Sequence, residues 1–436
     1  MMESLLHYTW RHKILPLGEL RTTDERYVEV INPGLHNRSG SGPDFFNAQL
    51  KIDGMLWVGN VEIHTRASDW YRHHHDSDKA YDNVILHVVE RADMDVTTSQ
   101  GRTLPTLVIP VAEQLSRDYE ALLNTEKYPP CYEIIPDLPR LKVHSWISAL
   151  QTERLEQKTQ AMSDRVKLMN GSWDDGYFIT LSRNFGFGVN GDAFETWAKT
   201  VPLRAVDHHR DDLMQVEAIF IGVAGLLPRL ANDKSIKDAE RYCREFAYLQ
   251  KKFGLTSMEP SLWSYKTRPQ NHPHVRLIEL ARMYHECRTS IGSLLECKTV
   301  KDIGKLYNIS GNKLTLLAIN TAIPSIFAYG RSHDKEALCQ QAFDMLDSLK
   351  CEDNNIIRMW RECGLEVRTA GDSQALIQLK KEYCDKKGCL RCRFGYEFLT
   401  GTHRNRFLGE TDEQQIKSRI ENCSSGEPPK ELKTEN

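Results

Sequence analysis

Residues 44–65 read DFFNAQLKIDGMLWVGNVEIHT, two strand-like runs separated by the pair Asp53-Gly54. Each run is short and rich in β-branched or aromatic residues, which is typical of strands. Asp-Gly favours a tight hairpin, because its backbone angles match the twist of the paired strands. We therefore expect two adjacent antiparallel strands at residues 44–52 and 55–65.

Further strand and helix signals lie on both sides of this hairpin. An amphipathic helix is expected before it, at residues 3–15, where Pro16 stops it. A second helix is expected after it, at residues 68–81, with Ser68 as its N-cap. The remaining strand-like runs are residues 27–31, 83–89 and 104–109. The predicted order is helix, three strands, helix, strands.

Beyond a Pro-containing stretch, the hydrophobic period changes from 2 to about 3.6, which indicates helices. The sequence thus predicts an α+β protein, with an N-terminal α/β module around a mixed central sheet and a mainly α-helical C-terminal region. The expected parts are an α/β domain at 1–112, a linker at 113–140, a helical domain at 141–350, a helical segment with clustered cysteines at 351–410 and a polar tail at 411–436.

Composition limits the functional classes. Among 436 residues, 57 Lys and Arg stand against 60 Asp and Glu, so a role on nucleic acid needs a local basic patch. No apolar run approaches the roughly 20 residues of a membrane span, and no signal-peptide pattern opens the chain. The 11 cysteines are mostly scattered, which fits a reducing compartment. We expect a cytoplasmic protein with no membrane partner, and the sequence does not indicate its oligomeric state.

The polar residues of the hairpin point to a metal site. Strand alternation puts Glu62 and His64 on one face, and Asp44 opens the neighbouring strand. Carboxylate oxygens suit Mg²⁺ or Mn²⁺, and an imidazole beside them can act on a bound water. The alternative is that Asp44 caps a turn and Glu62 faces solvent.

This arrangement resembles the signature of the PD-(D/E)XK nucleases, through Pro43-Asp44 and Glu62-Ile63-His64. The resemblance implies a restriction-endonuclease-like module in which Asp44, Glu62 and the Ile63 carbonyl bind the metal. His64 would take the place of the catalytic Lys. Because His64 lacks the fixed charge of Lys, the phosphate would need another cation, such as Arg66 or Arg72.

The chain as a whole resembles a bacterial, Bacteroidetes-type family of unknown function, DUF2851. The resemblance is carried by motifs spread along the chain, among them Gly42-Pro-Asp-Phe45, Gly59-Asn-Val-Glu-Ile-His64, Arg183-Asn-Phe-Gly-Phe187 and Tyr383 through Gly395. It implies relatedness and no activity.

A histidine-rich segment follows the hairpin. In a continuous helix, His74 and Asp78 would lie one turn apart on one face, so we expect both to be metal ligands. The alternative is that His73 to His75 form an exposed polar turn, and that His87 is a hydrogen-bonded core residue.

A second metal signal lies near the C-terminus, where Cys384, Cys389 and Cys392 are spaced C-x₄-C-x₂-C. This spacing predicts zinc or an iron–sulfur cluster, as in plant-type sites where a distant cysteine completes the set. The candidate fourth ligands are Cys351, Cys363, Cys423 and His403. Four nearby cations could form a phosphate-binding patch: Lys386, Lys387, Arg391 and Arg393. The alternative is three free thiols in a basic turn.

The function these residues favour is a metal-dependent nuclease that hydrolyses DNA or RNA, with nucleic acid as its partner. A second hypothesis is a non-catalytic nucleic-acid or protein-binding scaffold with a nuclease-like fold. A third is a metal-dependent hydrolase of another ester class.

Overall fold

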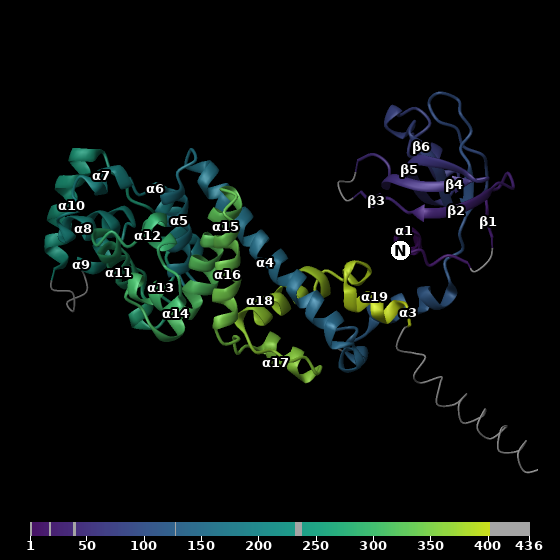
Figure 1. The fold of residues 1–436 in the computed structure, drawn as a ribbon. Helices are drawn as coiled ribbons and strands as arrows, with labels where there is room; N and C mark the ends of the chain where they lie inside the picture. Colours follow the sequence, from purple (N-terminus) through teal and green to yellow (C-terminus); the bar gives the residue numbers. More distant parts are fainter. Residues whose placement is uncertain (1, 17–18, 38–40, 127, 232–237, 402–436) are drawn as a thin grey trace, which may run out of the picture. The chain divides into compact units, whose positions relative to one another are not determined.

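A computed structural model describes residues 2–16, 19–37, 41–126, 128–231 and 238–401. The chain divides into two compact units (Figure 1), one formed by residues 1–138 with the chain from 382 onwards, the other by residues 139–381. The first unit holds a mixed β-sheet and the second is helical, so the α+β class predicted from the sequence is confirmed.

The sheet of the first unit has seven strands: β1 Leu20–Arg21, β2 Tyr27–Asn32, β3 Leu35–His36, β4 Phe45–Ile52, β5 Met55–Arg66, β6 Val84–Arg91 and β7 Thr106–Val108. Their order is β1-β2-β4-β5-β6-β7, and β3 pairs with β4. The pairs from β1 to β5 are antiparallel, whereas β5, β6 and β7 run parallel. The predicted mixed sheet is therefore confirmed.

The sheet curves until its two ends meet. Thr22, beside β1, bridges to Leu107 in β7, so the sheet is nearly closed like a barrel. Strands of this length must twist to pack against helices, and a bulge in β4 between Phe45 and Ala48 adds local curvature.

Local sequence accounts for most strand limits. β2, β4, β5 and β6 match the predicted runs to within two residues, whereas β7 is shorter than predicted. Asp53 and Gly54 form the predicted hairpin, with Ile52 paired to Met55 and positive φ angles of 50° and 80°. Strands β1 and β3 have only two residues each, which is too short for an alternation of apolar and polar residues to be recognised in the sequence.

The central strand β5 separates an apolar face from a polar one. Helix α1 (Met2–Arg11) packs Leu6 and Trp10 against a core that includes Val61 and Ile63. Because side chains alternate along a strand, Glu62 and His64 face away from that core. Both are nevertheless buried. Strand β5 therefore has the predicted apolar and polar faces, and the polar side chains Glu62 and His64 are buried.

The first unit is completed by segments far apart in the sequence. Residues 113–140, expected as a linker, contain α3 (Glu113–Asn124) and the short helix η2 (Tyr132–Asp137). The chain returns through η7 (Cys389–Arg391) and α19 (Arg393–Leu399), and α19 packs against both α3 and η2.

Residues 140–400 are mainly helical, as predicted. The helices of the second unit are α4 Arg140–Leu168, α5 Trp173–Phe185, α6 Gly191–Thr200, α7 Leu203–Asp207, α8 Leu213–Val223, α9 Leu227–Ala231, α10 Ala239–Phe253, α11 Pro273–His285, α12 Ile291–Leu295, α13 Val300–Tyr307, α14 Gly311–Leu317, α15 Ile323–Ser332, α16 Glu336–Ser348, α17 Asn355–Glu362 and α18 Ala370–Gln378. The long helix α4 packs against α5, α15 and α18 (Figure 1).

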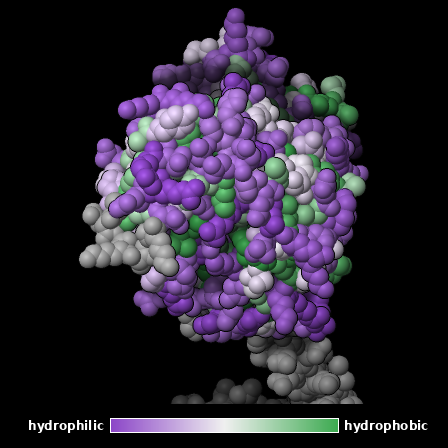
Figure 2. All heavy atoms as spheres, turned by 90° about the vertical axis from the view of Figure 1, so that its left-hand side faces the viewer, coloured by the Kyte–Doolittle hydropathy of each residue, from purple (hydrophilic) through white to green (hydrophobic). Residues whose placement is uncertain are grey.

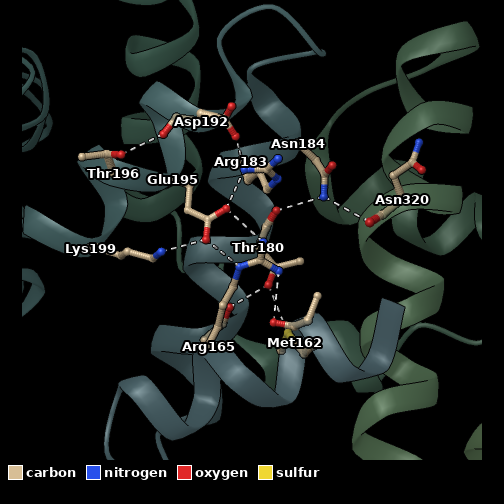
Figure 3. Close-up of polar contacts among 12 residues, drawn as sticks. Met162, Arg165, Thr180, Arg183, Asn184, Asp192, Glu195, Thr196, Lys199 and Asn320 are labelled. Carbon is tan, nitrogen blue, oxygen red and sulfur yellow. Dashed lines mark hydrogen bonds and ion pairs between the residues drawn. The ribbon is translucent and has the colours of Figure 1, made fainter. Parts of the chain in front are cut away.

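One predicted helix, residues 313–327, is interrupted. A π-helical turn, η5 (Ala318–Ala322), separates α14 from α15. Such a turn leaves backbone carbonyls free to bond elsewhere. Here the Ile319 carbonyl accepts from the half-buried Lys158, and the Asn320 carbonyl accepts from Asn184 (Figure 3).

A cluster of ion pairs links the first three helices of the second unit (Figure 3). The Glu195 carboxylate, on α6, accepts hydrogen bonds from Arg165 on α4, Arg183 on α5 and Lys199 on α6. Burial alone would raise the pKa of Glu195, but these three cations lower it to about 2. The cluster thus fixes the relative positions of three helices.

The face of the second unit seen in Figure 2 is mainly hydrophilic, with hydrophobic residues in small groups. Among the described helices, none combines the length and apolar character needed to cross a membrane.

Candidate metal centre

The two predicted carboxylates lie together where β4 begins. Glu62 Oε2 accepts a hydrogen bond of 2.9 Å from the backbone N–H of Asp44. In return, Asp44 Oδ2 accepts one of 2.9 Å from the backbone N–H of Ile63. This exchange holds both acids in fixed orientations.

A histidine from α1 joins them. His7 Nε2 lies 3.2 Å from Asp44 Oδ2. Burial disfavours charge on His7, but its contact with Asp44 raises its pKa above the usual value. His7 therefore places a protonatable ring against the carboxylate pair.

Two further histidines lie near the other oxygen of Glu62, and a third lies beside them. Donor atoms of His64, His73 and His75 lie within 4.8 Å of one another, close enough to share one ion. Glu62 Oε1 lies 3.3 Å from His75 Nε2 and 3.7 Å from His64 Nε2. Glu62 thus stands between the aspartate and the histidine group.

The chain path after β5 explains which histidines reach the site. Helix α2 spans only Asp69–Arg72, and it ends in a Schellman motif. His74 has a φ of 62°, its N–H bonds to the Tyr71 carbonyl, and the His75 N–H bonds to the Trp70 carbonyl. After this reversal His73 and His75 lie beside His64, where His75 is buried and His73 is exposed, and His74 is exposed outside the group.

Three expectations about this segment are corrected. The helix predicted at 68–81 stops after one turn, and a separate short helix, η1, covers Lys79–Tyr81. Ser68 is no side-chain cap, because its hydroxyl donates to Asp93 instead. His74 and Asp78 do not share a face, since Asp78 caps η1 by accepting from the Ala80 N–H.

His87 lies beneath the group, fully buried on β6. Its Nε2 is 2.9 Å from His64 Nδ1, and His64 Nε2 is 3.1 Å from His73 Nδ1. His87 Nδ1 has no hydrogen-bond partner within the described residues. His87 is thus a core residue, as the alternative reading held, and it also orients His64.

The electrostatics of the centre are strongly perturbed. Burial raises the pKa of Glu62, and the charge of Asp44 adds to this, giving about 9. Burial and the neighbouring histidines lower the pKa of His64 to about 2, and burial lowers that of His87 to about 3. Such concentrated perturbation is typical of functional sites.

The donor set fits a divalent cation. Two carboxylates offer the oxygen ligands preferred by Mg²⁺ and Mn²⁺, and neutral imidazoles can ligate the latter. The two acids lie close together in a buried position, where the ionisation of both costs free energy. A bound cation would relieve the repulsion between the acids.

A cavity of about 330 Å³ opens beside His7. It is lined by Arg11 of α1 and by three of the predicted phosphate-binding residues, Lys386, Lys387 and Arg391. The structure therefore brings this basic group, from the far end of the sequence, next to the histidine that contacts Asp44.

The other predicted cations lie apart from this cavity lining. Arg66 and Arg72 are exposed, and Arg72 pairs with Asp69 at 3.1 Å. Arg393 is the first residue of α19.

The clustered cysteines form a second group in the same unit. Cys384 is half-buried, whereas Cys389 and Cys392 are buried around η7. Cys351 and Cys363 belong to the helical unit, where Arg361 donates to the Cys351 sulfur. Cys423, His403 and the predicted polar tail lie outside the described residues.

Sequence reasoning missed His7 as a site residue. His7 follows apolar residues in a helix that looks structural, and only the tertiary fold brings it to Asp44. The signal in the sequence was the position of His7, a polar residue beside the apolar stripe of α1.

A family model described as "Protein of unknown function (DUF2851)" matches residues 3–313 and 305–355. No curated protein and no solved structure matches the chain.

Proposed function

Since the chain belongs to the DUF2851 family, whose function is unknown, we propose from its own residues that the first unit is a metal-dependent nuclease that hydrolyses phosphodiester bonds of DNA or RNA. The observation that carries this proposal is the reciprocal bonding of Asp44 and Glu62, with histidines on both sides. Two acids held this way at a strand terminus form an oxygen-rich metal site.

The order of elements supports a restriction-endonuclease-like module. Apart from the two-residue strands β1 and β3 and the short helix η1, the order is helix α1, the antiparallel strands β2, β4 and β5, the one-turn helix α2 and the parallel strand β6. This order is similar to that of the PD-(D/E)XK core. Asp44 immediately precedes β4 and Glu62 lies on β5, which supports their assignment as the two motif acids.

The chain's own groups have distinct roles in this proposal. Asp44, Glu62 and the Ile63 carbonyl would hold a Mg²⁺ or Mn²⁺ ion. When bound, the ion supplies charge that stabilises the phosphate transition state and lowers the pKa of a water. His75, whose Nε2 lies 3.3 Å from Glu62 Oε1, would orient a water beside Glu62 and accept a proton at a ring nitrogen.

His64 suits a positioning role better than that of a base. It is 2 % exposed, and its two ring nitrogens already face His87 and His73. His64 occupies the motif position of the catalytic Lys. Another cation must therefore supply the positive charge that this Lys would carry.

The basic cavity supplies that charge. Arg11, Lys386, Lys387 and Arg391 line it together with His7, and His7 contacts Asp44. Phosphates of a nucleic-acid strand would be held there by cations while the scissile group reaches the carboxylates.

The experiment is an assay of single-stranded DNA, duplex DNA and RNA with Mg²⁺ or Mn²⁺, repeated with excess EDTA. Cleavage that EDTA abolishes would support the proposal. Binding without cleavage in any metal would contradict it and favour a scaffold.

A further inference from the structure

Four cysteines meet in the first unit, and they include one that sequence spacing does not single out. Cys131 precedes η2, and it is 7 % exposed. Cys389 and Cys392 flank η7, at 9 % and 8 % exposed. Burial raises the pKa of Cys131, and the nearby Cys392, Cys384 and Cys389 raise it further, which places all four thiols within electrostatic reach.

Contacts between the two segments that carry the cysteines hold these segments together. Helix α19 starts directly after Cys392 and packs against η2, which starts directly after Cys131. Tyr128 Oη donates to Asp385 at 2.8 Å, and Lys387 Nζ donates to the Leu123 carbonyl at 3.2 Å. Two segments more than 250 residues apart in the sequence are thus joined around the cysteines.

The local turn is built like a ligand knuckle. The Cys392 N–H bonds to the Cys389 carbonyl at 3.1 Å, which closes the C-x₂-C turn. A Cβ on Gly395 would lie 2.2 Å from that same carbonyl, so this position requires glycine. The turn therefore holds two sulfurs in fixed positions against α19.

We propose that Cys131, Cys384, Cys389 and Cys392 together bind an iron–sulfur cluster. Cys131 is then the distant fourth ligand that the C-x₄-C-x₂-C spacing lacks. This centre is independent of whether Asp44 and Glu62 bind a cation.

The spacing of the cysteines along the chain favours a cluster over one zinc ion. Plant-type iron–sulfur sites combine C-x₄-C-x₂-C with one distant cysteine, which is the pattern that Cys131 completes here.

The cluster would tie the returning chain to the N-terminal half of the unit, and so hold Lys387 and Arg391 at the basic cavity.

The test is made on full-length wild-type protein purified without oxygen. We expect iron and acid-labile sulfide in stoichiometric amounts, with broad visible absorption. Absence of both, before and after reconstitution with ferrous iron and sulfide, would overturn the proposal. Stoichiometric zinc under those conditions would overturn it too.

Ligand identity is tested with Cys131→Ser, and Cys363→Ser in the helical unit is the matched control. We expect Cys131→Ser to lose most of its iron and absorption, and the control to keep both. Retention of the full cluster by Cys131→Ser would contradict its assigned role.

If Cys131→Ser fails to fold, wild-type protein gives the answer by alkylation and mass spectrometry. The four cysteines should be protected with the cluster bound and modified after its removal, whereas Cys363 should react equally in both states. Modification of Cys131 with the cluster intact would overturn the assignment.

Discussion

The backbone N–H of Asp44 donates a 2.9 Å hydrogen bond to Glu62 Oε2, so the two acids are fixed against each other. Glu62 is buried, and like charges this close disfavour joint ionisation. A positive ion at this position would favour the ionised form of both acids.

The first prediction concerns metal binding by this pair. Asp44→Asn and Glu62→Gln keep the shape of each side chain but remove a ligand charge. We expect each to weaken Mn²⁺ binding by more than about 100-fold in calorimetry, since loss of an outer-shell partner alone costs about 10–100-fold. Unchanged affinity in both variants would contradict a shared ion.

The second prediction uses neighbouring histidines as a matched pair. His75 lies 3.3 Å from Glu62 Oε1, whereas His74 is exposed and points away. We expect His75→Ala to weaken Mn²⁺ binding by about 10-fold, as for an outer-shell partner. His74→Asn, which keeps a residue tolerant of positive φ, should bind as wild type. Equal effects would mean that the histidine group is not part of the centre.

Local sequence was enough to predict the two strands that position Asp44 and Glu62. The Asp53-Gly54 turn and the alternation along residues 55–65 predicted both the β4–β5 hairpin and the shared face of Glu62 and His64. Both features depend on residues close in sequence, where turn chemistry and strand period act directly.

The parts that failed depend on contacts between distant segments. His7 and Cys131 acquire their partners only through tertiary packing, which no local period encodes. The helix predicted at 68–81 failed because a left-handed residue at His74 ended it, although the apolar spacing continued.

The third prediction concerns the basic cavity. Lys387 and Arg391 line it, and each phosphate contact that is lost should lower the slope of log affinity against log salt by about 1. We expect Lys387→Gln and Arg391→Gln to weaken nucleic-acid binding and flatten this slope in fluorescence titrations. The control is Lys51→Gln, which removes an exposed lysine paired with Glu29 on the sheet. Loss of affinity in the control alone would place the nucleic acid elsewhere.

The fourth prediction concerns stability of the helical unit. Glu195 is ionised in the fold, and its cations hold its pKa near 2, against 4.5 as the ordinary value. We expect Glu195→Gln to lower the free energy of unfolding by about 2 kcal/mol at pH 7, the size of one hydrogen bond to a charged group.

The pH dependence has a definite sign. A depressed pKa stabilises the fold above the unfolded value of 4.5, and this contribution disappears as the pH falls towards about 2. Denaturant titrations of wild type and Glu195→Gln should therefore converge below pH 4.5. A difference that stays constant from pH 7 to pH 3 would show that the charge of Glu195 does not stabilise the fold.

The central claim is tested most directly by the rate of phosphodiester cleavage at saturating Mn²⁺, compared between wild type, Asp44→Asn and Lys51→Gln. Removing a ligand that positions charge in the transition state should reduce the rate by about 10³-fold or more, while circular dichroism shows an intact fold. We expect Asp44→Asn to lose activity to this extent and Lys51→Gln to cut as wild type. Equal cleavage by Asp44→Asn and wild type, or no cleavage by wild type of any DNA or RNA substrate, would contradict the nuclease assignment.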